Sequence, residues 1–286
     1  MYVASLPSEP FAAAAIAPTG HNRAHGSIDL RFGRRGTVRT LFQMGAARVL
    51  FPRTAIGPEA VLVNTAGGIT GGDTFDYRIV VDPGAGALVT TQAAEKLYRS
   101  AGDDGRIRTR LSVGSRGWLA WLPQETILFE GSRLRRDTAI EVAPGGRALA
   151  CETIVFGRQA RGEAMRTGLL HDSWTVTRGG KLAWADVLNL HGDVAAALAR
   201  PAVGDGAVAY ATVLYVADNV RRWLDAARDL VGCAHITAAA TAMGEVLLAR
   251  FAADTLYALR RELTAFLTQF LRAVRLPVGL PHVWSS

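Results

Sequence analysis

The chain has 286 residues, which is long enough to bury a core that needs no disulfide or metal to fold. With 49% hydrophobic and 20% charged residues, its composition excludes a disordered acidic tail, a coiled coil and a collagen-like repeat. The formal net charge is +7, but the basic residues are spread along the chain, so this charge indicates compositional bias more than a nucleic-acid surface.

The N-terminal segment carries no recognisable targeting signal. An apolar run from Phe11 to Ala17 follows Glu9 instead of a basic residue, and it is too short for a secretory signal. Nowhere does the chain approach the roughly 20 apolar residues of a membrane helix, and its two cysteines fit a reducing compartment. We expect a cytoplasmic protein in which residues 1–25 form a flexible extension and residues 26–286 form a single domain.

From about residue 27 to residue 190, apolar and polar residues alternate in short runs that are separated by glycine turns. This period of two predicts strands with one buried face, and no alternation of strands with helices appears. The sequence therefore predicts a mainly β fold, either an antiparallel β-sandwich or a helical β architecture. The expected strands are residues 27–32, 76–81, 87–91, 107–113, 117–122, 138–142, 148–156, 173–177 and 181–188.

Two α-helices are expected in the C-terminal half. Apolar residues recur at helical spacing from Val220 to Val231, after Asp218 as the predicted N-cap. A longer pattern of the same kind reaches Val274, after Asp254 as its predicted N-cap. Between them, residues 236–251 predict a hairpin that turns near Met243 and Gly244.

A glycine-rich stretch, residues 64–73, has the sequence NTAGGITGGD. A phosphate-binding loop would end in Gly-Lys-Ser or Gly-Lys-Thr, whereas this stretch ends in Gly72 and Asp73, which places a carboxylate where an anion would bind. The stretch instead indicates a loop between two strands, with glycines that adopt positive φ or allow a close backbone approach. Nucleotide binding is not expected.

Acidic residues recur inside apolar or small-residue segments. A buried carboxylate must be ion-paired, hydrogen-bonded or metal-bound. Structural ion pairs with arginines are the favoured interpretation, with Glu152–Arg158 and Arg161–Glu163 as expected pairs, whereas a cation route and acid–base catalysis stay open as alternatives. The residues concerned are Asp73, Glu95, Glu125, Glu152 and Glu163.

Established signatures of catalysis are missing from the sequence. It contains no HExxH, CxxC or His-x-His pattern for a tight metal site. It also has no GxSxG pattern, and neither cysteine has a histidine nearby in the sequence to activate it. We expect no catalytic residues and no tightly bound cofactor.

Several segments together resemble the family of urease accessory protein D (UreD, also called UreH). They occur in the family's order and at compatible separations, and the closest agreement falls between about residues 40 and 165. The matching stretches are residues 62–73, 90–100 and 121–132, Glu152 followed by the GRQARGE run of residues 157–163, and the tryptophan-containing ending at residues 283–286.

The resemblance implies a non-enzymatic maturation factor with a mainly β fold. Such a protein would bind apo-urease and the accessory protein UreF directly, and the GTPase UreG through UreF. The assembled complex would deliver nickel to the urease active site, so Ni²⁺ would be a transient cargo. The five acidic residues named above would then be candidates for the nickel route, because oxygen ligands hold Ni²⁺ loosely enough for it to leave.

Two other functions stay open at this point. One is a carboxylate-dependent enzyme that acts on a small metabolite, and the other is an arginine-rich β protein that binds nucleic acid. The resemblance favours the urease maturation factor, with neither a nucleic acid nor a membrane as a partner.

Overall fold

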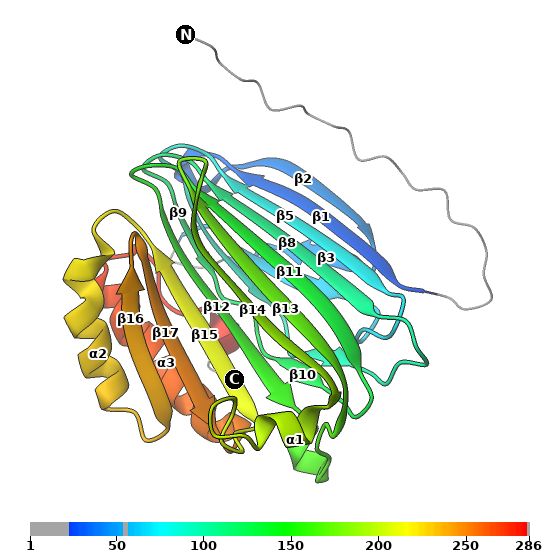
Figure 1. Ribbon diagram of the computed structural model, residues 1–286. Coiled ribbons are helices and arrows are strands. Elements are labelled where there is room, and N and C mark those ends of the chain that lie inside the picture. Colours follow the sequence, from blue (N-terminus) through cyan, green and yellow to red (C-terminus); the bar gives the residue numbers. More distant parts are fainter. Residues whose placement is uncertain (1–22, 54–56, 285–286) are drawn as a thin grey trace.

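The computed structural model describes residues 23–53 and 57–284, and two β-sheets stacked face to face form its main body (Figure 1). Most of the predicted N-terminal extension, residues 1–25, lies outside the described residues; His25 begins the first strand. Sheet A consists, in spatial order, of β14 (Lys181–Asp193), β13 (Thr167–Arg178), β11 (Arg133–Val142), β8 (Gly105–Val113), β5 (Thr74–Val81), β1 (His25–Phe32) and β2 (Val38–Gly45).

Sheet B has ten strands. Its main path is β16 (Thr237–Met243), β17 (Val246–Ala253), β15 (Ala209–Val216), β12 (Arg147–Phe156), β9 (Trp118–Trp121), β6 (Gly86–Thr91), β4 (Glu59–Asn64) and β3 (Ala47–Leu50). Beside this path, β10 (Thr126–Leu128) pairs with β12 and with β7 (Glu95–Leu97).

The prediction of a mainly β fold is confirmed, but the antiparallel sandwich is wrong. Between β4 and β13 the chain passes repeatedly from one sheet to the other, and only the steps from β6 to β7 and from β9 to β10 stay within sheet B. The neighbours within each sheet therefore come from successive coils of the chain and run parallel. The result is a solenoid-like stack. Alternation of apolar and polar residues shows only that a strand has one buried face. It is the same in parallel and antiparallel strands, so it could not reveal the direction in which the strands pair. Antiparallel pairs such as β1–β2 and β13–β14 lie at the ends of the stack.

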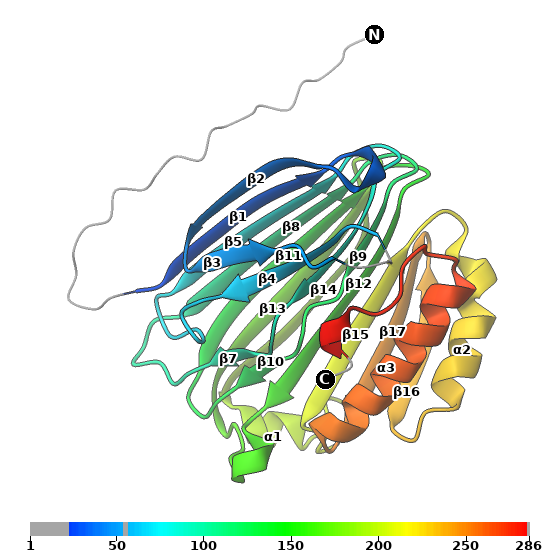
Figure 2. The ribbon, with the colours of Figure 1, turned by 180° about the vertical axis from the view of Figure 1, so that it is seen from behind.

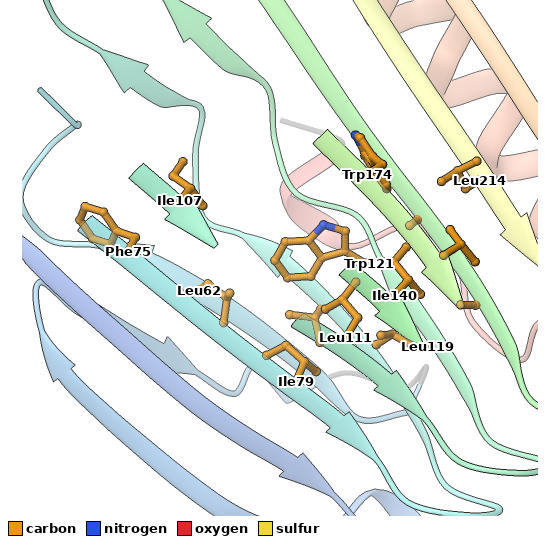
Figure 3. Packing of buried hydrophobic residues seen from close by; sticks show 14 of the residues in the cluster. Leu62, Phe75, Ile79, Ile107, Leu111, Leu119, Trp121, Ile140, Trp174 and Leu214 are labelled. Atoms are coloured by element: carbon orange, nitrogen blue, oxygen red, sulfur yellow. The ribbon is translucent and has the colours of Figure 1, made fainter. Parts of the chain in front are cut away.

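Two hydrophobic layers hold the stack together. The first lies between the sheets, where Ile79, Leu111, Trp121 and Ile140 pack among the labelled side chains of Figure 3. The second lies between the outer face of sheet B and the helices α2 (Leu224–Gly232) and α3 (Leu256–Ala273), which Figure 2 shows side by side over β15, β16 and β17. Strands such as β12 are therefore buried on both faces, as parallel strands usually are.

Both C-terminal helices are confirmed, but their predicted caps are wrong. A 3-10 turn at Val220–Trp223 precedes α2, and Asp218 instead forms an ion pair with Arg178. Helix α3 is capped by the hydroxyl of Thr255, which accepts a hydrogen bond from the backbone N–H of Ala258 at 3.1 Å. The predicted hairpin is present as β16 and β17. The elements without a counterpart in the prediction are β2, β3, β4, β7, β10, β15 and the short helix α1 (Val194–Leu198).

The C-terminal tail returns across sheet B. Its 3-10 turn, His282–Trp284, places the Trp284 ring in the second hydrophobic layer, with 6% of the residue exposed. The indole Nε1 of Trp284 donates a hydrogen bond to the backbone oxygen of Leu122 at 3.0 Å. Within residues 23–53 and 57–284, no helix is long and apolar enough to cross a membrane.

Candidate functional site: a polar band between the sheets

A buried charged cluster interrupts the hydrophobic layer between the sheets. Arg136 on β11 donates to both carboxylate oxygens of Asp172 on β13, from Nε at 2.8 Å and from Nη2 at 3.0 Å. Its Nη2 also lies 2.7 Å from Oε2 of Glu152, which reaches in from β12 in the opposite sheet. The three side chains are no more than 6% exposed. One guanidinium thus ties two carboxylates together across the interior.

The alternation of each strand explains why these charged groups point inward. On β11, Arg136 shares its face with the buried Leu134 and Ile140, and on β13, Asp172 shares its face with Leu170. Neighbouring hydroxyl groups complete the cluster. The Thr138 hydroxyl donates to Oε1 of Glu152 at 3.1 Å, and Nη1 of Arg136 donates to the Thr126 hydroxyl at 3.1 Å.

Burial sets the protonation behaviour of this cluster. Burial is the main cause that raises the pKa of Glu152 to about 7; the charge of Arg136 works against this rise, and the charge of Asp172 adds to it. Burial disfavours the charged form of Arg136, but the two carboxylates outweigh this and raise the pKa of the guanidinium. When all three groups are ionised, the cluster carries one more negative charge than positive charge.

A cavity of about 320 Å³ opens beside the two carboxylates. Glu152 and Asp172 are among its lining residues, with apolar side chains and alanines around them. Asp186 on β14 and Arg250 on β17 also line it and form an ion pair, and their side chains are 37% and 50% exposed. They therefore lie at the open side of the cavity, between the edge strand β14 of sheet A and strand β17 of sheet B.

A second cavity, of about 230 Å³, lies at the other end of the same interior strip. Glu95 on β7 lines it together with Asn64 and Tyr77, and Nδ2 of Asn64 donates to Oε1 of Glu95 at 3.0 Å. Burial raises the pKa of Glu95 to about 7. Burial, and then the charge of Glu95, also raise the pKa of Tyr77, so that its phenol stays protonated.

Polar side chains occupy neighbouring strand positions between the residues that line the two cavities. Glu95 is the register neighbour of Thr126 on the paired strands β7 and β10, and Thr126 in turn binds Arg136. On the other side of the cluster, Glu152 on β12 lies opposite Thr212 on β15, and Thr212 lies opposite Arg250 on β17. We call this strip the polar band; it consists of Glu95, Tyr77, Thr126, Arg136, Thr138, Glu152, Asp172, Thr212, Asp186 and Arg250.

Three of the five acidic residues singled out in the sequence lie outside the polar band. The carboxylate of Asp73 accepts the backbone N–H groups of Ala24 and Thr70, both at 2.8 Å. Glu125 faces α3 and forms an ion pair with Arg260 at 3.1 Å. Glu163 forms an ion pair with Arg158, and its hydrogen bonds to that guanidinium hold its pKa below the usual value.

The structure thus brings together Glu95 and Glu152 but none of the other three. The expected pairs are wrong in their partners, because Glu152 pairs with Arg136 and Glu163 pairs with Arg158. Pairing across adjacent strands and between sheets joins residues that are distant in sequence, which local spacing does not reveal.

The glycine-rich stretch forms the loop that was expected of it. Gly67, Gly68 and Gly72 have positive φ. A Cβ on Gly68 would lie 2.8 Å from the backbone oxygen of Lys96, so glycine allows the close approach of this loop to β7. The loop helps to shape the wall of the smaller cavity.

The polar band offers oxygen ligands for a metal ion. No group of three or more His, Cys, Asp or Glu side chains that could hold a metal occurs in the described part of the chain. Cys151 is adjacent to Glu152 in sequence, yet it points to the opposite face of β12, into the layer beneath the helices. The chemistry of the band is therefore that of carboxylates and hydroxyls, which form loose contacts with a divalent transition metal.

Sequence reasoning missed Arg136, Asp172, Asp186 and Arg250. For the first two, a signal was present. Arg136 and Asp172 each fall on the apolar parity of their strand, where a charged residue requires an explanation. Asp186 and Arg250 are half-exposed, and nothing in their local sequence distinguishes them from ordinary surface charges.

The fold and the site define a solenoid-like β protein with a charged band through its interior. A family model described as UreD urease accessory protein matches residues 24–285. The chain is 44% identical over 253 residues to the urease accessory protein UreD of Azorhizobium caulinodans, which covers 88% of this chain and 91% of that relative. It is 43% identical over 278 residues to UreD 1 of Methylobacterium radiotolerans, covering 94% and 95% of the two chains.

A third relative, the urease accessory protein UreD of Xanthobacter autotrophicus, is 41% identical over 285 residues, which is 99% of this chain and 97% of the relative. The chain belongs to the UreD family of urease accessory proteins. The resemblance in the sequence motifs is confirmed, and the protein is an accessory factor in urease maturation. The alternative of a carboxylate-dependent enzyme is wrong.

Proposed function

We propose that this protein helps to load urease with nickel by letting Ni²⁺ pass along the polar band between its two cavities. The observation that carries the proposal is the band itself, because its polar groups link two cavities through an otherwise apolar layer. The band has two carboxylates for every guanidinium at its centre, so it attracts a cation.

The ligands of the band suit a transient cargo. A conducting site must bind an ion well enough to admit it and weakly enough to release it. Carboxylate oxygens bind Ni²⁺ less firmly than thiolates or imidazoles, and within the described residues the band contains neither. Glu95 and Glu152 are the proposed carboxylates of the route, joined by Asp172 and Asp186, which sequence reasoning had not included.

The proposed partners are apo-urease and UreF, with UreG recruited through UreF. In support, the relatives carry the name of urease accessory proteins, and a cation route is useful only when both of its ends face other proteins. The two amphipathic helices over sheet B are proposed to contribute surface to the UreF complex, which should bury well over about 1,600 Å² as a permanent complex. Separate elution of the co-expressed pair at micromolar concentrations would contradict this proposal.

The route is tested by the variant Glu152→Gln. Glutamine keeps an acceptor for Thr138 and a side chain of the same size, while it removes the charge. We expect the variant to be soluble and to bind UreF, while the nickel content of the urease that it matures falls severalfold. The matched control is Glu163→Gln, which alters a carboxylate outside the band and should leave nickel loading unchanged.

The outcome that overturns the route is specific. If Glu152→Gln supports full nickel loading, the ion does not depend on the band. The same conclusion follows if every band variant that lowers loading also fails to fold or to bind UreF, because the loss is then structural.

A further inference from the structure

We propose that Arg136 is a positioning residue that keeps the interior carboxylates from trapping the passing metal ion. The inference rests on the proposed function, since it concerns how the polar band releases a divalent cation. Arg136 binds both oxygens of Asp172 and one oxygen of Glu152, and Thr138 binds the other. Three of the four carboxylate oxygens therefore accept a hydrogen bond, and the fourth, Oε2 of Glu152, contacts Nη2 of Arg136 as an ion pair while it accepts no hydrogen bond from the described residues.

The position of the cavity shows on which side a metal ion would meet this cluster. Glu152 and Asp172 line the cavity of about 320 Å³, whereas Arg136 does not. The guanidinium thus backs the two carboxylates, and the cavity lies on another side of them. An ion in the cavity is attracted by two carboxylates and repelled by the cation behind them.

Charge balance determines how strongly the ion is held. With Arg136 the ionised cluster carries a net charge of −1, and without it the same carboxylates would carry −2 in an interior of low dielectric constant. Two unopposed carboxylates facing one cavity resemble a tight site for a divalent cation, from which release is slow. Arg136 therefore favours transit over storage.

Arginine suits this task better than lysine. Its planar fork makes the two parallel bonds to Asp172 and leaves a further N–H for Thr126, which fixes the cation at one place. Its charge persists at any physiological pH. A purely structural role would require only that the three strands stay connected, which an uncharged packing residue can also achieve.

The test measures the affinity of the purified full-length protein for Ni²⁺ by equilibrium dialysis, together with the nickel content of the urease that it matures. For Arg136→Met, we expect binding at least about tenfold tighter than wild type and lower urease loading. For Arg136→Lys, which keeps the charge but lacks the planar fork, we expect a smaller change in both values than for Arg136→Met. The matched control is Arg178→Met, because Arg178 is equally buried and paired with two carboxylates, Asp218 and Glu245, but lies outside the polar band.

A pair of variants keeps the test valid if Arg136→Met does not fold. Glu152→Gln leaves the cluster at net charge zero, and Arg136→Met combined with Glu152→Gln returns it to −1. We expect the double variant to bind Ni²⁺ more tightly than Glu152→Gln alone. Equal affinity in that pair, or a folded Arg136→Met variant with wild-type affinity, would overturn the role of Arg136.

The two proposals fail separately in this experiment. If Glu152→Gln leaves urease loading unchanged, the route itself is refuted and the role of Arg136 with it. If Glu152→Gln lowers loading but the removal of Arg136 leaves Ni²⁺ affinity unchanged, the route stands and only the inference about Arg136 is wrong.

Discussion

Replacement of Glu95 by glutamine should stabilise the folded protein at alkaline pH. The structure places this carboxylate between the sheets, where burial raises its pKa from 4.5 to about 7. Below pH 4.5 the group is protonated in both the folded and the unfolded chain. As the pH rises from 4.5 to 7, the unfolded chain loses the proton first, so the wild-type protein loses stability over this window. Glutamine has no proton to lose and escapes this penalty.

The difference between the two pKa values fixes the magnitude. It corresponds to about 3 kcal/mol once the pH is above both values. Urea unfolding at pH 5, 6, 7 and 8 should therefore show Glu95→Gln more stable than wild type by about 1 kcal/mol at pH 5 and by about 3 kcal/mol at pH 8. Glutamine retains the acceptor for the Asn64 amide, so the hydrogen bond itself is not lost.

A second carboxylate provides the control with the opposite sign. Arg158 holds the pKa of Glu163 below its usual value. The ion pair therefore stabilises the folded protein above the ordinary pKa of glutamate, and this stabilisation is lost as the pH falls. Glu163→Gln should therefore gain nothing at pH 8. If Glu95→Gln is destabilised at pH 8, or differs from wild type by the same amount at pH 5 and pH 8, the buried environment assigned to Glu95 is wrong.

Three further changes test the fold. Trp284→Ala should lower the free energy of unfolding by about 3–5 kcal/mol in urea titrations, because it leaves a cavity where the indole ring packs in the second hydrophobic layer. A loss below about 1 kcal/mol would contradict that packing. Gly45→Ala should prevent the turn after β2 from closing, because a Cβ would lie 1.8 Å from the backbone oxygen of His25. The control is Gly180→Ala, which also has positive φ but faces open space, and it should lower the free energy of unfolding by only about 1 kcal/mol in the same titrations. Phe42→Lys, on the exposed edge strand β2, should raise solubility in a precipitation assay and leave stability within about 0.5 kcal/mol, and unchanged solubility would show that this edge does not drive self-association.

Most strands of the fold were predictable, but their pairing was not. Period-two alternation located β8 and the second half of β11 because burial of one face is a local property of the sequence. Whether β8 lies beside β5 and β11 in parallel, or beside a hairpin partner, depends on where short connections send the chain next. Here most connections between β4 and β13 cross to the other sheet. The alternation of residues along one strand carries no information about that crossing.

The candidate site was predictable to a similar degree. A carboxylate within the apolar run around Glu152 requires a partner, and the sequence supports that requirement. The partner itself, Arg136, lies on a strand of the opposite sheet, and sequence distance does not predict it. The helix caps show the same limit. Asp218, predicted as a cap, instead forms an ion pair with Arg178, and Thr255 caps α3 in place of the predicted Asp254. Local sequence does not distinguish a cap from an ion pair or from a neighbouring capping residue.

Passage of Ni²⁺ through the interior of this protein is tested most directly by a variant that fills the cavity beside Glu152 and Asp172. Thr212 lines that cavity between Glu152 and Arg250, and a volume of about 320 Å³ has room for a phenyl ring. Urease matured with Thr212→Phe should contain severalfold less nickel than urease matured with wild type or Thr212→Ser, although all three proteins bind UreF equally. Full nickel loading by a folded Thr212→Phe variant would contradict passage through the polar band.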